Sequence, residues 1–139
     1  HHNKEALNKN SAAKSRVIKQ LVEALLFEQL VPYHYTNGNF WFSVGDTRYI
    51  ARGHISSFGR IRLDATYIKQ IAPFKTATID LPTLINALPA SDATKDQLLK
   101  ELSQTIGFSE WNDAHLTPTK SRRDLNYSAL ESAILEGHP

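Results

Sequence analysis

The sequence predicts an α+β fold: an N-terminal amphipathic helix, a small antiparallel β-meander and then a helical segment. Apolar residues first recur at helical spacing, then alternate with polar residues in short runs between turn residues, and finally recur at helical spacing again. The length of 139 residues suits one domain with a single core. We expect residues 10–139 to form that domain. Residues 1–9, which open with His1 and His2, are expected to be a disordered start with the remnant of an affinity tag.

The first helix is predicted over residues 10–30. Asn10 or Ser11 can cap its start, and Pro32 disfavours helical backbone at Val31 and so ends it. Its apolar face carries Val17, Ile18, Leu21, Val22, Leu25, Leu26 and Leu30. Its polar residues, expected mostly on the opposite face, are Lys14, Arg16, Lys19, Gln20 and Glu23. Such a helix can lie on a membrane, but packing against a core is the commoner use and is the one we expect.

The middle of the sequence predicts an antiparallel meander. Alternation predicts strands over residues 40–44, 47–55 and 60–64, and Asn37-Gly38 has the residue types of a hairpin turn. Residues 65–71 fit a fourth short strand or a turn of helix, and their periodicity does not decide between the two. Three strands need a cover, and the first helix is the obvious candidate.

The last third predicts helices. Asp80 can cap a helix that ends before Pro89, and Ser91 or Asp92 can cap a second helix for which Gly107 is a plausible stop. Residues 108–126 are polar and predict an irregular loop. A final short helix is expected from Ser128, which with Glu131 fits a capping box.

Composition excludes several kinds of site. The chain has no cysteine, which rules out disulfides and thiolate zinc sites. No apolar run is long enough to cross a membrane, and the histidines lack metal-ligand spacing, so we expect no metal site in this chain. The net charge of +2 is too mild to indicate nucleic-acid binding by itself.

Three groups of residues could contact a ligand. Lys120, Arg122 and Arg123 could meet phosphate or carboxylate groups, although a solvated loop is the commoner role of such a run. Arg52, Arg60 and Arg62 form a second basic set, expected on the outer face of the sheet and solvated. Gly137, His138 and Pro139 form the third group: the glycine permits close approach of a ligand, the proline fixes the chain direction, and the histidine can donate a hydrogen bond to an anion.

The order of these segments resembles the N-terminal region of the NRPS-independent siderophore synthetases, the aerobactin-synthetase-like family. The likeness covers roughly residues 14–139, through "KQLVEALLFEQL", "YIARGHISSFGRIRLDA", "LPTLINALPASDATKDQLLKEL", "KSRRDL" and "LESAILEGHP". In that family a Gly-His-Pro opens a longer nucleotide-binding motif, and Gly137, His138 and Pro139 match its first three positions. The likeness is nearest to the hydroxamate synthetases of the putrebactin and desferrioxamine type, with aerobactin synthetase nearly as close.

The resemblance implies a larger parent enzyme of which this chain is the N-terminal lobe, cut inside that motif. Such an enzyme uses ATP and Mg²⁺ to adenylate a carboxylate, and an amine or hydroxylamine-bearing diamine then displaces AMP. On this analogy Gly137, His138 and Pro139 bind the nucleotide, and no catalytic residue is identified. The implied partners are the remaining synthetase chain, the carboxylate and hydroxamate-diamine substrates, and a second copy in a cytoplasmic homodimer, without nucleic acid or membrane. The chain alone is expected to be inactive.

Two other functions remain open at this point. A free-standing α+β interaction module would expose an apolar patch that binds another chain. A nucleic-acid binder would use Arg52, Arg60, Arg62, Arg122 and Arg123, and its affinity would fall steeply with salt.

Overall fold

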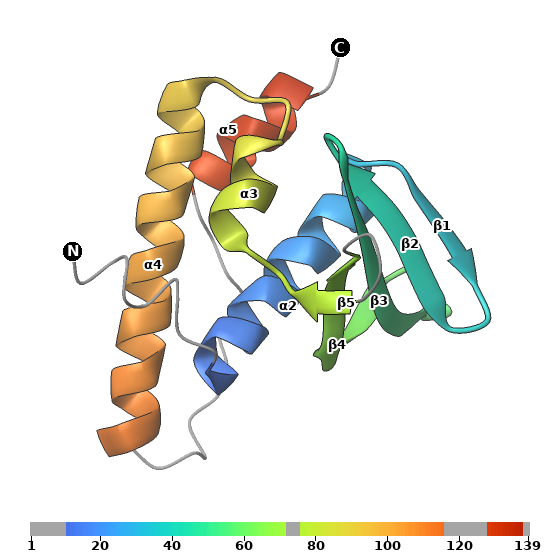
Figure 1. The fold of residues 1–139 in the computed structure, drawn as a ribbon, viewed down its shortest axis with the longest axis horizontal. Helices are drawn as coiled ribbons and strands as arrows, with labels where there is room; N and C mark the ends of the chain where they lie inside the picture. The colour runs from blue at the N-terminus through green and yellow to red at the C-terminus, as the bar shows by residue number, and fades with distance from the viewer. Residues whose placement is uncertain (1–10, 72–75, 116–127, 138–139) are drawn as a thin grey trace.

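A computed structural model describes residues 11–71, 76–115 and 128–137 (Figure 1). Within these residues the predicted α+β class is confirmed: one helix precedes an antiparallel sheet of five strands, and further helices follow. The helices are α2 (Ala12–Phe27), α3 (Leu81–Asn86), α4 (Asp92–His115) and α5 (Ser128–Gly137). The strands are β1 (Tyr33–Thr36), β2 (Asn39–Val44), β3 (Thr47–Ile55), β4 (Ile61–Ile71) and β5 (Thr76–Thr78). They lie side by side in chain order, so the sheet is a meander.

Helix α2 begins as the sequence predicts but ends earlier. The Ser11 hydroxyl accepts a hydrogen bond from the Lys14 backbone N–H at 3.1 Å, which caps the first turn. The helix ends at Phe27 rather than at the predicted Leu30, because Gln29 adopts a left-handed conformation with φ of 57°. The Leu30 N–H then bonds back to the Leu25 carbonyl at 3.0 Å, as in a helix C-terminal cap.

The first hairpin confirms the turn prediction and adds a strand that was not predicted. Asn37 and Gly38 both have positive φ, 51° and 79°, as a type I′ turn requires. Thr36, the last residue of β1, pairs with Asn39, the first residue of β2, on either side of this turn.

Residues 65–71 are strand, and they continue 61–64 as β4. The pairing with β3 is irregular in the middle, because Ala51 pairs with Ile68 whereas Gly53 pairs with Leu63. One residue of β3 therefore faces residues 64–67. Within this bulge the Asp64 carboxylate accepts hydrogen bonds from both the backbone N–H and the hydroxyl of Thr66, at 2.8 and 2.6 Å. The bulge breaks the alternation, which explains why periodicity could not assign this stretch.

The core lies between the sheet and the helices. Figure 1 shows α2 crossing one face of the sheet, with α4 on its far side and α3 and α5 near one end of α4. Side chains from all of these layers are fully buried in one cluster, among them Leu21 and Leu25 of α2, Phe40 of β2, Tyr49 of β3 and Leu98 of α4. The predicted cover of the sheet by the first helix is thus confirmed.

Helix α4 is longer than predicted. Gly107 was expected to end it, but the helix continues to His115, and residues 108–115 are helical rather than irregular. Gly107 has ordinary helical backbone and does not adopt the left-handed conformation with which a glycine often ends a helix. The additional turns are supported by Trp111, whose ring stacks on His115 with centroids 4.4 Å apart. Helix α3, by contrast, ends at Asn86, two residues before the predicted Leu88.

Candidate functional site

The C-terminal end of α5 is the candidate site, because the predicted nucleotide-contacting tripeptide begins there. Gly137 is the last residue of α5. His138 and Pro139 lie outside the described residues, as do Lys120, Arg122 and Arg123. The described residues therefore show how α5 is held in place, whereas the predicted side-chain contacts to the nucleotide lie outside them.

The start of α5 is held by a carboxylate in the middle of α4. Glu101 accepts hydrogen bonds from the Ser128 hydroxyl at 3.1 Å and from the Ala129 backbone N–H at 3.4 Å. Ser128 is thus the first helical residue, bonded to another helix, rather than the residue before the helix that the predicted capping box required. Ala129, Leu130 and Ala133 are buried near this contact, so an apolar face of α5 packs on the rest of the fold.

The end of α5 is held by the start of α4. The Glu136 carboxylate accepts a hydrogen bond from the Ser91 backbone N–H at 3.1 Å and one from the Thr94 hydroxyl at 3.4 Å. A carboxylate is favoured at this position, because the first backbone N–H groups of a helix carry partial positive charge. With Glu101 at one end and Ser91 at the other, α5 runs antiparallel to the first half of α4.

The second predicted basic set lies on the sheet. Arg52 and Arg62 are exposed and alternate with buried residues such as Ala51 and Ile61, as expected for the outer face. The Arg52 guanidinium lies 4.4 Å above the centre of the Tyr67 ring, in cation–π geometry. Arg60 precedes β4 and is exposed in the turn.

Asp64 in the bulge has a lowered pKa. Its hydrogen bonds from the Thr66 hydroxyl and backbone N–H lower the pKa of the Asp64 carboxyl, and the nearby positive charge of Arg52 adds to this effect. The bulge therefore presents a carboxylate that stays ionised at lower pH than usual.

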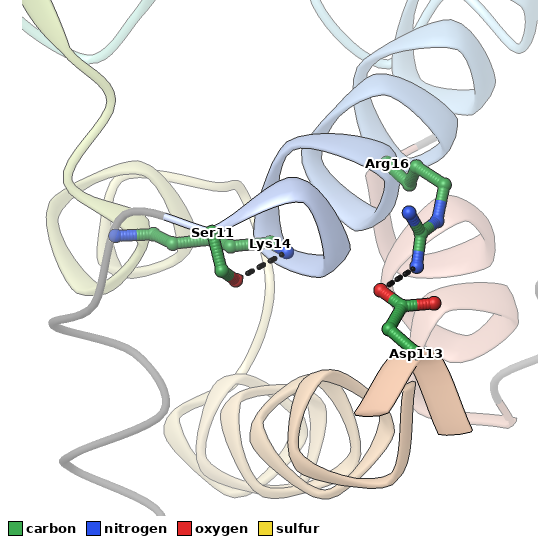
Figure 2. Close-up of polar contacts among 4 residues, drawn as sticks. All are labelled: Ser11, Lys14, Arg16 and Asp113. Carbon is green, nitrogen blue, oxygen red and sulfur yellow. Dashed lines mark hydrogen bonds and ion pairs between the residues drawn. The ribbon is translucent and has the colours of Figure 1, made fainter. Parts of the chain in front are cut away.

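Lys14 is a residue whose position the sequence pattern misassigned. It was expected on the polar face of the first helix, but it is only 5% exposed. Figure 2 shows Arg16 directed toward Asp113 of α4, with an ion-pair distance of 2.8 Å, and Lys14 leaving α2 on a different side. Burial lowers the pKa of Lys14, and the charge of Asp80 partly opposes that shift. The pattern failed because Lys14 lies one turn before Ile18 on the same helix face, and only its charged end distinguishes it from a core residue.

No metal centre or membrane span emerges from the part of the chain that the structure describes. Its histidine, aspartate and glutamate side chains form no group of three or more that could hold a metal ion. None of its helices is both long and apolar enough to cross a bilayer.

No protein-family model matches the chain, and no curated protein matches its sequence. Its fold is similar to that of the petrobactin biosynthesis protein AsbB from Bacillus anthracis str. Sterne, with a TM-score of 0.61 and 20% identity over 89% of this chain and 23% of that one. It is also similar to the aerobactin synthetase IucC from a hypervirulent pathotype of Klebsiella pneumoniae, with a TM-score of 0.57 and 17% identity over 73% of this chain and 19% of that one.

The chain has the fold of one part of these two proteins. It spans about a fifth of the length of each. At this level of identity the likeness is one of fold, and the activity of either protein is not thereby transferred to this chain.

Proposed function

We propose that this chain is the N-terminal lobe of an ATP-dependent siderophore synthetase. The parent enzyme would adenylate a carboxylate and join it to an amine or a hydroxylamine-bearing diamine. The observation that carries the proposal is the fold likeness to a petrobactin biosynthesis protein over 89% of the chain. The sequence resemblance, which includes Gly137 at the end of α5 and the His138-Pro139 that follow it in the sequence, supports the same family independently of the fold.

The proposed chemistry has two steps. A carboxylate oxygen attacks the α-phosphorus of ATP, and pyrophosphate leaves. The nitrogen of the acceptor then attacks the acyl carbon, and AMP leaves, which makes the amide. Negative charge develops on the phosphoryl oxygens in the transition state, and preorganised cations and hydrogen-bond donors would stabilise it.

In this lobe the proposed nucleotide contacts are Gly137, His138 and Pro139. The His138 imidazole would donate a hydrogen bond to a phosphate oxygen, and Gly137 would leave room for close approach. Lys120, Arg122 and Arg123 are proposed as further anion contacts. The described residues offer no ligand set for Mg²⁺, so we derive no step through that ion.

The narrower features of the proposal rest on the sequence resemblance alone. These are the hydroxamate type of product, the homodimer, the cytoplasmic location and the inactivity of this chain by itself. Neither matched structure is of the putrebactin or desferrioxamine type.

The test is ligation by the full-length parent. With ATP, a panel of di- and tricarboxylates and hydroxylamine as the acceptor, we expect release of AMP and formation of a hydroxamate. His138→Ala should lower kcat/KM for ATP about 100-fold, the usual loss when one donor to a developing oxyanion is removed. His34→Ala is the matched control, because His34 is an exposed histidine on β1 and should leave the rate unchanged. A parent that releases no AMP with any carboxylate, or a His138→Ala enzyme as active as the wild type, would overturn the proposal.

The second candidate is a free-standing interaction module. The observation in its favour is that several large apolar side chains are exposed, including Phe58 at 95% and Phe108 at 66%. Such a module would show no ATP-dependent ligation in any form of the protein, so the same assay distinguishes the two candidates.

A further inference from the structure

A hollow of about 420 Å³ lies beside the turn that joins β3 to β4. Phe27 from the end of α2 and Phe58, Arg60 and Arg62 from the turn and the start of β4 line it, and these four residues are here called the Phe58 surface. Both aromatic rings face solvent, Phe27 at 56% and Phe58 at 95% exposure. Two exposed phenylalanines side by side on one small surface are uncommon in a protein that binds nothing there.

The turn holds Phe58 outward by its own hydrogen bonds. The Ser56 N–H donates to the Arg60 carbonyl at 2.8 Å, and the Gly59 N–H donates to the Ser56 carbonyl at 2.9 Å. The Arg60 N–H donates to the Ser56 hydroxyl at 3.2 Å. Gly59 has a φ of 80°, which favours glycine. Because the backbone is fixed in this way, Phe58 is presented to solvent by a defined turn rather than by a loose loop.

A contact between α2 and β4 brings Phe27 to the same place. The Glu23 carboxylate accepts a hydrogen bond from the Leu63 backbone N–H at 2.7 Å. Phe27 follows Glu23 by one helical turn, and Arg62 directly precedes Leu63. The end of the helix is therefore positioned against the start of the strand, and the two phenylalanines share one surface as a result.

The charge of the Phe58 surface is positive. No aspartate or glutamate lines the hollow. Among the described residues, neither Arg60 nor Arg62 forms an ion pair with a carboxylate. A guanidinium presents several N–H donors that match the two oxygens of a carboxylate, so the surface suits an acidic partner.

The shape of the surface favours a protein partner over a small molecule. Sites for small ligands are concave and cover most of the ligand, whereas Phe58 projects almost completely into solvent. A projecting aromatic beside arginines is typical of the residues that dominate binding between proteins. A single-stranded nucleic acid is disfavoured, because stacking of successive bases needs several free aromatic faces on a basic track.

We propose that the Phe58 surface docks this lobe onto the remaining part of its synthetase chain. The docking patch would offer an apolar pocket to Phe58 and carboxylates to Arg60 and Arg62. This inference rests on the proposed function. In the two matched structures about four-fifths of the chain lies outside the matched part, so a lobe of this fold has ample chain available to cover such a surface.

The test compares one substitution in two settings, the 139-residue chain and the full-length parent. Phe58→Ala should leave the thermal midpoint of the 139-residue chain unchanged, because the side chain is 95% exposed there. In the parent it should lower the midpoint and make amide hydrogen exchange of residues 56–60 about tenfold faster, since docking protects the turn. In the parent, Arg60→Glu should also lower the thermal midpoint and speed amide exchange of residues 56–60. Phe108→Ala is the matched control, an exposed phenylalanine on α4 that should change neither protein.

The outcomes separate this proposal from the proposed function. A parent that ligates with ATP but keeps its midpoint and exchange rates in Phe58→Ala overturns the docking proposal alone. If Phe108→Ala lowers the thermal midpoint of the parent as much as Phe58→Ala does, docking is not specific to the Phe58 surface and the proposal is overturned. A 139-residue chain that dimerises at micromolar concentration, and loses the dimer in Phe58→Ala, assigns the surface to a second copy and also overturns the proposal. Tight binding of single-stranded RNA by the 139-residue chain, if Arg60→Glu abolishes it, also overturns the docking proposal.

Discussion

Gly53 lies where the backbone of β4 passes close to that of β3. A Cβ atom added there would lie 2.2 Å from the Arg62 carbonyl oxygen and 3.0 Å from the Leu63 Cα atom. Both neighbours are backbone atoms, which cannot turn aside as a flexible side chain could. Gly107 differs completely, because no atom lies within 4 Å of the position that its Cβ would take.

These two glycines give opposite predictions. Gly53→Ala should lower the free energy of unfolding by about 3 kcal/mol, because the strands must separate to admit the methyl group. Gly107→Ala should raise it by about 0.5 to 1 kcal/mol, the usual gain when alanine replaces glycine inside a helix. Urea unfolding of both variants measures the two effects. Equal stability of Gly53→Ala and the wild type would contradict the close approach of β3 and β4.

Lys14 predicts a dependence of stability on pH. Its pKa in the folded chain lies below the ordinary value of 10.5, so between these two values the unfolded chain binds more protons than the folded chain. The free energy of unfolding should therefore rise as the pH rises through that interval. Lys14→Met should remove this rise and should stabilise the protein at pH 7 by about 1 kcal/mol, because a buried charge is replaced by an apolar chain.

The measurement for Lys14 is urea unfolding at several pH values from 7 up to the ordinary lysine pKa of 10.5. Burial raises the pKa of Tyr49 above its ordinary value of 10.0, so Tyr49 loses its proton at lower pH in the unfolded chain than in the folded chain. Near the top of this range Tyr49 therefore lowers the free energy of unfolding as the pH rises, which opposes the slope from Lys14, and the comparison with Lys14→Met separates the two. A slope that persists unchanged in Lys14→Met would show that another group causes it.

The contact between α2 and β4 is the feature to test at the scale of the elements. Glu23 accepts from the Leu63 N–H at 2.7 Å and pairs with Lys19 at 3.0 Å. Glu23→Ala leaves the Leu63 N–H without its partner in a partly buried place, and it should cost about 2 kcal/mol of unfolding free energy. Glu28→Ala is the control, because Glu28 is exposed at the end of the same helix. A loss for Glu23→Ala no larger than that for Glu28→Ala would mean that water replaces the carboxylate.

The elements also show how far the sequence predicts this fold. The bounds of β3 and the Asn37-Gly38 turn were predicted correctly, because alternation and turn residues are local signals. The end of α2 was missed because Gln29, a residue type that seldom does so, takes a left-handed conformation, after which the Leu30 N–H bonds back to the Leu25 carbonyl. Strands β1 and β5 were missed because they have four and three residues, too few for alternation to register.

The candidate site was less predictable than the fold. The histidine and glycine of a short tripeptide carry no periodic signal, so only the family resemblance pointed to Gly137 and His138. The hydrogen bonds that hold α5 could not be foreseen, since Glu101 and Glu136 look like ordinary surface residues of their helices. The Phe58 surface was equally hidden, because it joins the end of one helix to a turn about thirty residues later.

At the scale of the whole molecule, the layers are joined by one shared core. The sheet, α2 and α4 with α3 and α5 form one continuous core, so the position of α5 is tied to the sheet through buried side chains. The likeness to two much longer proteins covers 73% and 89% of this chain, which is far more than one motif. The end of α5, where the proposed nucleotide contacts begin, is therefore anchored by the same core as the sheet.

The placement of α2 before the sheet also has a consequence for synthesis on the ribosome. Every strand pairs with its neighbour in sequence, so each hairpin can close as soon as it emerges. Helix α2 has no such neighbour, and the strand residue that bonds to Glu23 comes 40 positions later. At about 5 to 20 residues per second, its apolar stripe is left uncovered for about 2 to 8 seconds. During that interval the nascent chain offers a binding segment to a chaperone, and it ceases to do so once β4 has been made.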